Sequence, residues 1–143
     1  MLPPEPLPDA MTEPHDHPDI AVVRSIYAAM TARDFAALFS YLTADVVITQ
    51  DPALPWGGRH VGHDGFATFG LTLSENIDSA VEIEAIFVAD GDVFQFGRTR
   101  GTVRANGASF DIPEVHRWTL RDGKAVTGHF AIDTEAMLAA LSR

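Results

Sequence analysis

Cysteine is absent from the 143 residues of this sequence. Its absence excludes disulfide bonds, thiolate metal sites, a cysteine nucleophile and redox chemistry at a Cys-x-x-Cys motif. The sequence also has no glycine-rich phosphate-binding motif and no His-Glu-x-x-His zinc motif. Chemistry in this protein is therefore expected from carboxyl and imidazole side chains.

Positive charge is scarce, because 10 lysines and arginines stand against 20 aspartates and glutamates, for a net charge of -10. Such a surface repels nucleic-acid phosphates and anionic lipids, so we expect no nucleic acid and no membrane as a partner. No apolar run approaches the roughly 20 residues that span a bilayer. The N-terminus lacks the basic start and apolar block of a signal peptide, and we expect a cytoplasmic protein.

Proline is concentrated at the N-terminus, where residues 1–18 hold six of the nine prolines. Because this segment has few aliphatic side chains and cannot continue a helix, we predict a flexible arm over 1–18 and one folded domain over 19–143. His15 and His17 lie in the arm beside acidic residues. A weak metal-binding tract is one interpretation of them, and unbound mobile side chains are the other.

Apolar residues recur at three- and four-residue intervals after the arm, which predicts a helix over 19–32 with Asp19 as its N-cap. Asp34 is expected to cap a second, shorter helix. The β-branched run 46–49 predicts a strand, and a third helix is expected over 64–73. Proline and glycine make the segment between them a loop.

Four strand-like segments follow, separated by turn signals of aspartate or asparagine before glycine. The segments cover 80–89, 92–104, 108–120 and 124–132. We therefore predict an antiparallel meander, followed by a closing helix that Asp133 caps. Helices gathered ahead of an antiparallel sheet indicate an α+β fold.

Four stretches of the sequence carry a further signal. They are the helix pair 22–38, the segment 44–47, the loop 55–66 with its Pro-Trp-Gly-Gly start, and the closing hairpin 116–126. In this order, residues 19–141 resemble the NTF2-like superfamily of cone-shaped domains, and specifically its SnoaL-like branch of polyketide-cyclase relatives. The resemblance implies a curved antiparallel sheet wrapped around N-terminal helices, with one apolar pocket.

The resemblance leaves the chemistry open, because the superfamily includes isomerases, cyclases, dehydratases, epoxide hydrolases and domains without known catalysis. It also implies a homodimer formed through the outer face of the sheet. The alternating strand around Val81, Ile83 and Arg100 fits such a contact.

Strand alternation over 108–120 places Glu114, His116 and Trp118 on one face. If that face lines the pocket, as the resemblance implies, His116 is a proton-transfer group with Glu114 as its partner and Trp118 as an apolar wall. Activity would then have a pH limb between roughly 5 and 8 that belongs to His116. The alternative is a solvated Glu114 and a hydrogen-bonded, structural His116.

The remaining pocket residues are chosen by their apolar character and their place in the resemblance. Gln50 is expected to donate a hydrogen bond to a substrate carbonyl group. The expected walls are Tyr27, Met30, Phe39, Trp56, Phe69, Phe94 or Phe96, Trp118 and Phe130. Such a pocket suits a small apolar or aromatic molecule with one or two oxygens.

Ketosteroid isomerase relatives use a carboxylate base against an oxyanion hole that contains a protonated carboxylic acid. Gln50 stands where their base would lie and His116 where the neutral acid would lie. Ile26 matches the position of their first-helix tyrosine, with Tyr27 adjacent. The sequence departs at all three positions, so steroid isomerisation by that mechanism is not expected.

Epoxide hydrolase relatives need an Asp/Arg/Asp arrangement that activates water. Arg98, Arg100 and Asp133 are available, but no aspartate lies between the arginines. The arginines alternatively form an exposed face or a dimer contact, and Asp133 alternatively serves only as a helix cap.

The loop 55–66 contributes Trp56, which we expect at the rim or lid of the pocket, since irregular segments carry much of protein function. Simple packing of this side chain is the alternative. His60 and His63 could bind a metal with Asp64, but the sequence offers no third inward ligand. We expect no metal and no cofactor.

The sequence thus predicts a protein that binds a small apolar or aromatic molecule. Cofactor-free acid/base catalysis on a carbonyl compound, of the cyclase, isomerase or dehydratase type, is the first hypothesis. A non-catalytic ligand-binding or accessory protein is the alternative, and a hydrolase similar to limonene epoxide hydrolase is a further one.

The homodimer gives a direct prediction. Light scattering at micromolar concentration is expected to give twice the 15.5 kDa mass of one chain. A mass of one chain would reject the dimer.

Overall fold

The computed structural model describes residues 17–143, so most of the predicted arm, including His15, lies outside the described residues. The elements are α2 (Pro18–Ala32), α3 (Phe35–Ser40), β1 (Leu42–Gln50), β2 (Gly58–Val61), α4 (Gly62–Asn76), β3 (Ile77–Ala89), β4 (Asp92–Val103), β5 (Ser109–Arg121), β6 (Lys124–Ile132) and α5 (Thr134–Leu141). The predicted α+β fold is confirmed.

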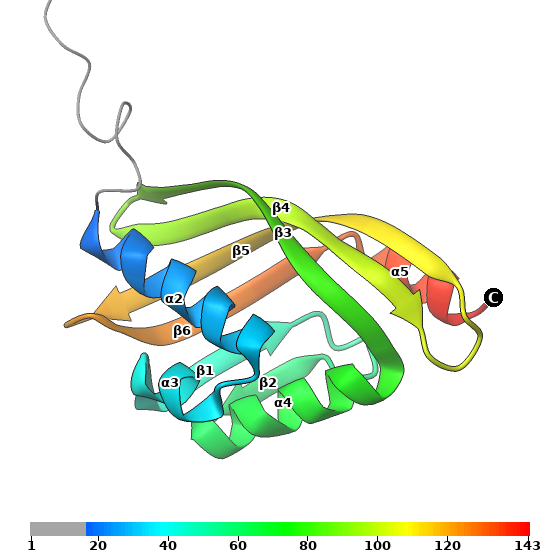
Figure 1. Cartoon of the computed structure of the whole chain (residues 1–143), viewed down its shortest axis with the longest axis horizontal. Helices are drawn as coiled ribbons and strands as arrows, with labels where there is room; N and C mark the ends of the chain where they lie inside the picture. The colour runs from blue at the N-terminus through cyan, green and yellow to red at the C-terminus, as the bar shows by residue number, and fades with distance from the viewer. Residues whose placement is uncertain (1–16) are drawn as a thin grey trace, which may run out of the picture.

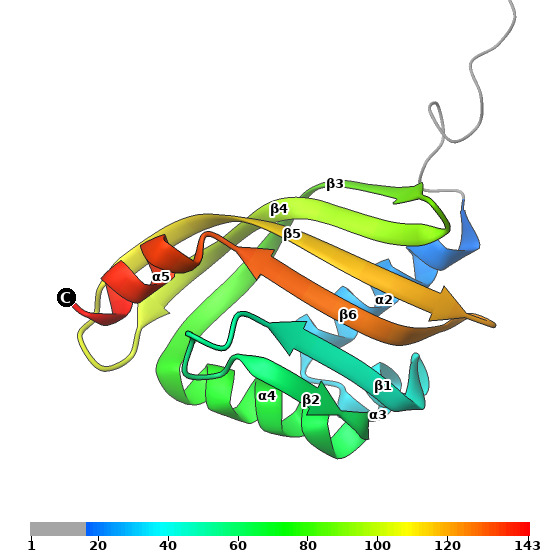
Figure 2. The same ribbon diagram turned by 180° about the vertical axis from the view of Figure 1, so that it is seen from behind.

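One curved, unclosed sheet of six strands forms the frame, in the order β2-β1-β6-β5-β4-β3. Strands β3 to β6 make the predicted antiparallel meander, and β1 pairs parallel to β6. Helices α2, α3 and α4 lie on one face of the sheet (Figure 1). In the view from behind, α5 lies over one end of β4 and β5, and no other helix of the described chain lies in front of β4, β5 and β6 (Figure 2).

Two of the three predicted hairpins have tight turns. Asp90 and Gly91 have φ values of 52° and 79°, and Asp122 and Gly123 have values of 53° and 77°. Positive φ at both central residues gives the turn whose twist matches that of the strands, and aspartate followed by glycine tolerates it.

The third hairpin has a longer loop between β4 and β5, and it is tied to the end of the chain. The side-chain amide of Asn106 donates to the carbonyl oxygens of Ala140 at 3.0 Å and Arg143 at 2.9 Å. Ala140 lies in the last turn of α5, where carbonyl groups lack partners within the helix, and Arg143 follows the helix. The loop therefore fixes α5 against the sheet.

Two of the three predicted helix caps are confirmed, and one is wrong. Asp34 accepts from the backbone N–H of Ala37, and Asp133 caps α5 as predicted. The prediction that Asp19 caps the first helix is wrong, because the ring Nδ1 of His17 accepts from the N–H of Asp19 at 3.1 Å. Pro18 takes the first helical position, where its missing N–H needs no partner.

The core lies between the concave face of the sheet and α2. Side chains from α2 and β1 that are fully buried there include Ile20, Val23, Ile26, Val46 and Ile48. Burial of this apolar area holds α2 against the sheet in which β5 carries Glu114 and His116. No helix among residues 17–143 is long and apolar enough to cross a membrane.

Two side-chain directions differ from the sequence prediction. Phe94 and Phe96 stack on Phe87 instead of lining the pocket, with ring centroids 5.9 and 5.3 Å away. Val81 and Ile83, expected on the outer face, pair with the inward positions Thr99 and Gly97 of β4. Position along a strand sets alternation, but only pairing with neighbouring strands decides which set faces inward.

The cap of α5 gives a stability prediction. Asp133→Ala is expected to lower the free energy of unfolding by about 1 kcal/mol, whereas Asp133→Asn changes it little, because asparagine accepts the same N–H. Denaturant unfolding of the two variants measures the difference. Equal loss in both would contradict a capping role.

Candidate functional site

A cavity of about 70 Å³ lies on the concave side of the sheet. Its lining includes nine of the residues proposed from the sequence, namely Tyr27, Met30, Gln50, Trp56, Phe69, Glu114, His116, Trp118 and Phe130. Leu73, Ile77, Ser79, Val81, Thr99, Ile132 and Met137 complete it. Phe39, also expected as a wall, stacks instead on His63 with 4.9 Å between ring centroids. The structure therefore brings the predicted set together, and its function stays a prediction.

Strand β5 places the three central side chains as the alternation predicted. Glu114, His116 and Trp118 are 4%, 7% and 0% exposed. The alternative of a solvated Glu114 is therefore wrong. A carboxyl group buried to this extent needs hydrogen-bond partners or a changed protonation state.

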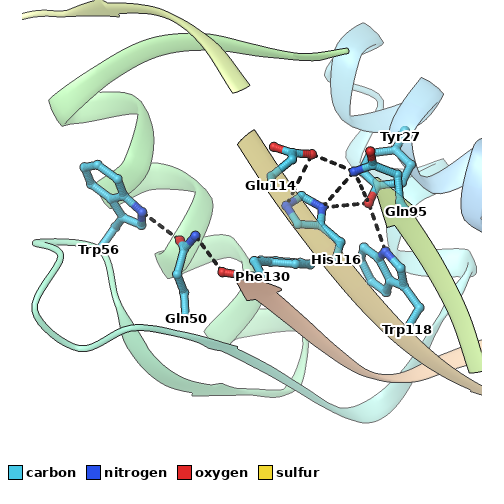
Figure 3. A network of polar contacts seen from close by, with 8 residues as sticks. All are labelled: Tyr27, Gln50, Trp56, Gln95, Glu114, His116, Trp118 and Phe130. Carbon is cyan, nitrogen blue, oxygen red and sulfur yellow. Dashed lines mark hydrogen bonds and ion pairs between the residues drawn. The ribbon is translucent and has the colours of Figure 1, made fainter. Parts of the chain in front are cut away.

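The hydroxyl group of Tyr27 joins α2 to this strand (Figure 3). Its oxygen lies 3.0 Å from Nε1 of Trp118 and 3.3 Å from the side-chain nitrogen of Gln95. Both of these groups can only donate, so the tyrosine oxygen accepts from them. The tyrosine hydrogen is then donated to Nδ1 of His116, at 2.7 Å.

This hydrogen-bond order fixes the tautomer of His116. Because Nδ1 is an acceptor, the neutral ring has its hydrogen on Nε2, which lies 3.4 Å from Oε2 of Glu114. Burial, with a smaller contribution from His129, lowers the pKa of His116 to about 3. This pKa lies below the range of roughly pH 5 to 8 that we expected for a catalytic His116, and it favours the neutral ring across that range.

Glu114 is the group that titrates near neutral pH. Burial raises the pKa of its carboxyl group to about 7, and a hydrogen bond from Gln95 opposes part of this rise. That bond joins the side-chain nitrogen of Gln95 to Oε2 of Glu114 at 2.6 Å. No lysine or arginine of the described chain lines the cavity to hold the carboxylate ionised.

A second polar pair lies on the other side of Phe130 (Figure 3). Nε1 of Trp56 donates to Oε1 of Gln50 at 2.8 Å, and the amide nitrogen of Gln50 donates to the Phe130 carbonyl oxygen at 3.0 Å. One amide hydrogen of Gln50 is left for a ligand. Trp56 is 1% exposed, so it is a fixed wall and not the rim or lid that we expected.

His60 holds the loop that carries Trp56. Its Nε2 lies 3.1 Å from the carbonyl oxygens of both Trp56 and Gly57. His63 likewise contacts the carbonyl oxygen of Leu42. Within residues 17–143 there is no group of three or more histidine, aspartate or glutamate side chains that could hold a metal ion.

The residues considered for an epoxide hydrolase are not brought together in the cavity. Arg98 pairs with Asp111, and Arg100 pairs with Glu82 and Asp111, on the outer face of the sheet. Asp133 accepts from the first turn of α5. No Asp/Arg/Asp arrangement forms with these residues.

Sequence reasoning missed Gln95, which is fully buried in β4 opposite His116. The available signal was the alternation Val93, Gln95, Gly97, Thr99. Because aromatic residues occupy the intervening positions, we expected that set of side chains to face inward.

The tautomer of His116 gives a spectroscopic prediction. In ¹⁵N-labelled protein, long-range ¹H–¹⁵N correlation is expected to show Nδ1 without a hydrogen and Nε2 with one, unchanged between roughly pH 5 and 8. A His116 signal that titrates near its ordinary pKa of 6.5 would contradict this hydrogen-bond order.

Tyr27→Phe should lower the free energy of unfolding by about 1–3 kcal/mol, since Trp118 loses its buried acceptor.

Solved structures of similar fold come from several bacteria. An NTF2-like protein of unknown function from Burkholderia pseudomallei is 25% identical, with a TM-score of 0.82 over 89% of this chain and 99% of that chain. An NTF2-like protein from Burkholderia thailandensis is 27% identical, with a TM-score of 0.79 over 87% and 96%. A protein with a ketosteroid isomerase-like fold from Catenulispora acidiphila, in complex with trimethylamine, is 17% identical, with a TM-score of 0.72 over 85% and 92%.

No curated protein matches this sequence. The sequence pattern that defines the SnoaL-like domain family matches residues 23–127, which include most of the first helix, the loop of Trp56 and most of the meander. The chain therefore belongs to the SnoaL-like domain family, within the NTF2-like fold.

Proposed function

We propose that the cavity binds a small, uncharged, apolar or aromatic carbonyl compound and catalyses proton transfer on it without a cofactor. Glu114 is the general base, and neutral His116 is the hydrogen-bond donor. One observation carries this proposal. Oε2 of the buried Glu114 lies 3.4 Å from Nε2 of the buried His116 on the wall of an apolar cavity, and burial raises the pKa of the carboxyl group to about 7 and lowers that of the imidazole.

The walls support the ligand class. Most lining side chains are aliphatic or aromatic, and the polar groups gather at two places, around Glu114 and around Gln50. Such a site gives affinity through apolar contact and orientation through a few hydrogen bonds. A phosphorylated ligand is disfavoured, because its charge would meet a carboxyl group and no cationic side chain of the described lining.

The proposed reaction begins with removal of a proton from the carbon next to the carbonyl group. The ionised carboxylate of Glu114 takes this proton, and the electrons of the broken C–H bond move to the carbonyl oxygen. The Nε2 hydrogen of His116, or the free amide hydrogen of Gln50, stabilises that oxygen. Return of the proton to another atom gives an isomer, and attack of the enolate within the molecule gives a ring.

In this proposal the base is the carboxyl group of Glu114, whereas the sequence predicted the imidazole group of His116. A base must be ionised to act, so the rate should rise with pH through about 7, the pKa of Glu114, and level off above it. Below that pH Glu114 is protonated and cannot act as the base.

Hydrogen–deuterium exchange tests the proposal without knowledge of the natural substrate. Small aromatic and aliphatic ketones in D₂O are expected to exchange their α-hydrogens faster with the protein than without it, as followed by ¹H NMR. Glu114→Gln keeps the shape of the side chain and should lower the exchange rate by about 10²-fold or more. His116→Ala should lower it as well, because the developing charge loses its donor.

Asp133→Asn is the matched control, since this residue lies outside the cavity and should leave exchange unchanged. Binding of the ketones without exchange would refute catalysis and leave the non-catalytic ligand-binding alternative. Neither binding nor exchange across ketones, phenols and lactones would refute the ligand class itself.

The homodimer is a separate part of the proposal. A groove of about 400 Å³ on the outer face is lined by Phe96, Pro113, Val115 and Ala131, with Glu84 and Arg98 among its charged residues. Phe96 is 39% exposed. Association of two copies over this groove would bury the exposed apolar surface, and the light-scattering mass tests it.

A further inference from the structure

We propose that Gln95 is a positioning residue that holds Oε2 of Glu114 as a hydrogen-bond acceptor and leaves Oε1 as the oxygen that takes up a proton. The catalytic meaning of this role depends on the proposed function, but the role itself is a property of the protein without a ligand.

The contacts of Gln95 converge on the proton-transfer network. Its side-chain nitrogen lies 2.6 Å from Oε2 of Glu114, 3.3 Å from the Tyr27 oxygen and 3.4 Å from Nδ1 of His116. An amide nitrogen has two hydrogens. The two shorter contacts use both of them, so Gln95 donates to the carboxyl group and to the hydroxyl group that fixes His116.

The orientation of the Gln95 amide follows from the acceptor role of Oε2 of Glu114. With the amide reversed, its oxygen would face Oε2 at 2.6 Å, and two acceptors would meet unless Oε2 carried a proton. The observed orientation therefore keeps the proton off Oε2, both in the ionised carboxylate and in the acid with its proton on Oε1. Oε1 of Glu114 has no hydrogen-bond partner among residues 17–143 and points away from the network in Figure 3.

Stability alone does not explain this glutamine. Its own oxygen, Oε1, is buried without a hydrogen-bond partner in the described part of the chain. A buried acceptor without a partner destabilises a protein, and a leucine here would avoid that cost. The oxygen fits beside Gly97, where an added Cβ would lie 2.4 Å from it. Gln95 therefore lowers the stability of the folded protein through its unpaired oxygen. What it provides is two N–H donors, one toward Glu114 and one toward Tyr27.

Among the groups that face Glu114, Gln95 is its main hydrogen-bond donor. His116 on the same strand is neutral, and Tyr27 from α2 donates to His116 instead of to Glu114. The paired residues in β4 and β6 are Gly97 and Ile132. On the outer face, Glu84 and Arg98 line the groove that Glu114 also borders, and His129 lies in β6.

An NMR titration of the protein without ligand tests this role. With ¹³C-labelled glutamate, the carboxyl signal of Glu114 is expected to titrate with a midpoint near pH 7. In Gln95→Leu the midpoint should rise by about one unit, because the ionised form loses a charge-assisted hydrogen bond. Gln95→Glu should raise it further, since two carboxyl groups then share one site. The pH at which the exchange rate of the ketones rises should shift together with the midpoint of the Glu114 titration.

Val93→Ala is the matched control. Val93 is fully buried on the same strand, so its truncation lowers stability without removing a bond to Glu114. Its midpoint should equal that of the unmodified protein. An unchanged midpoint in Gln95→Leu, or an equal shift in Val93→Ala, would overturn the positioning role.

A measurement on the unmodified protein covers the case in which the Gln95 variants do not fold. The side-chain ¹⁵N–¹H₂ signals of Gln95 should include one strongly displaced hydrogen, and they should titrate with the same midpoint as Glu114. Signals that do not respond to the ionisation of Glu114 would overturn the inference. Because no ligand or turnover is needed, this result is independent of whether the ketones bind or exchange.

Discussion

The hydrogen bond from the Tyr27 hydroxyl group to Nδ1 of His116 is the contact on which the arrangement of the site depends. It joins α2 to β5 at the centre of the core, 89 residues apart in the chain. Since Trp118 and Gln95 donate to the same oxygen, the tyrosine hydrogen is left for Nδ1 of His116. Nδ1 is occupied as an acceptor, and the imidazole ring faces Glu114 with its Nε2 hydrogen.

The electrostatic consequence is a division of roles between two neighbouring residues. Both side chains are buried, and burial disfavours the charged form of each. The imidazole group therefore loses its proton at a lower pH than usual, and the carboxyl group keeps its proton to a higher pH. Of the two, the carboxyl group is left to titrate near neutral pH, in a cavity where the described lining offers it no cation.

Much of the fold could be predicted from local sequence patterns. The turns at Asp90 and Asp122, the caps at Asp34 and Asp133, and the order of helices and strands all depend on a few adjacent residues. The cap of α2 was missed, since histidine is not among the usual capping residues. The inward face of β4 was also missed, because pairing with β3 and β5 sets it and aromatic residues occupy its outer face.

The sequence by itself determined which side chains are available and which of them share a face of β5. With no cysteine and a hydrophobic strand that carries Glu114 and His116, carboxyl and imidazole chemistry at one place followed from alternation alone. Only the tertiary structure decided which of the two titrates. Burial, the donor from α2 and the amide of Gln95 come from elements distant in the chain, and a pKa depends on the surroundings of a group in space and not on its neighbours in sequence.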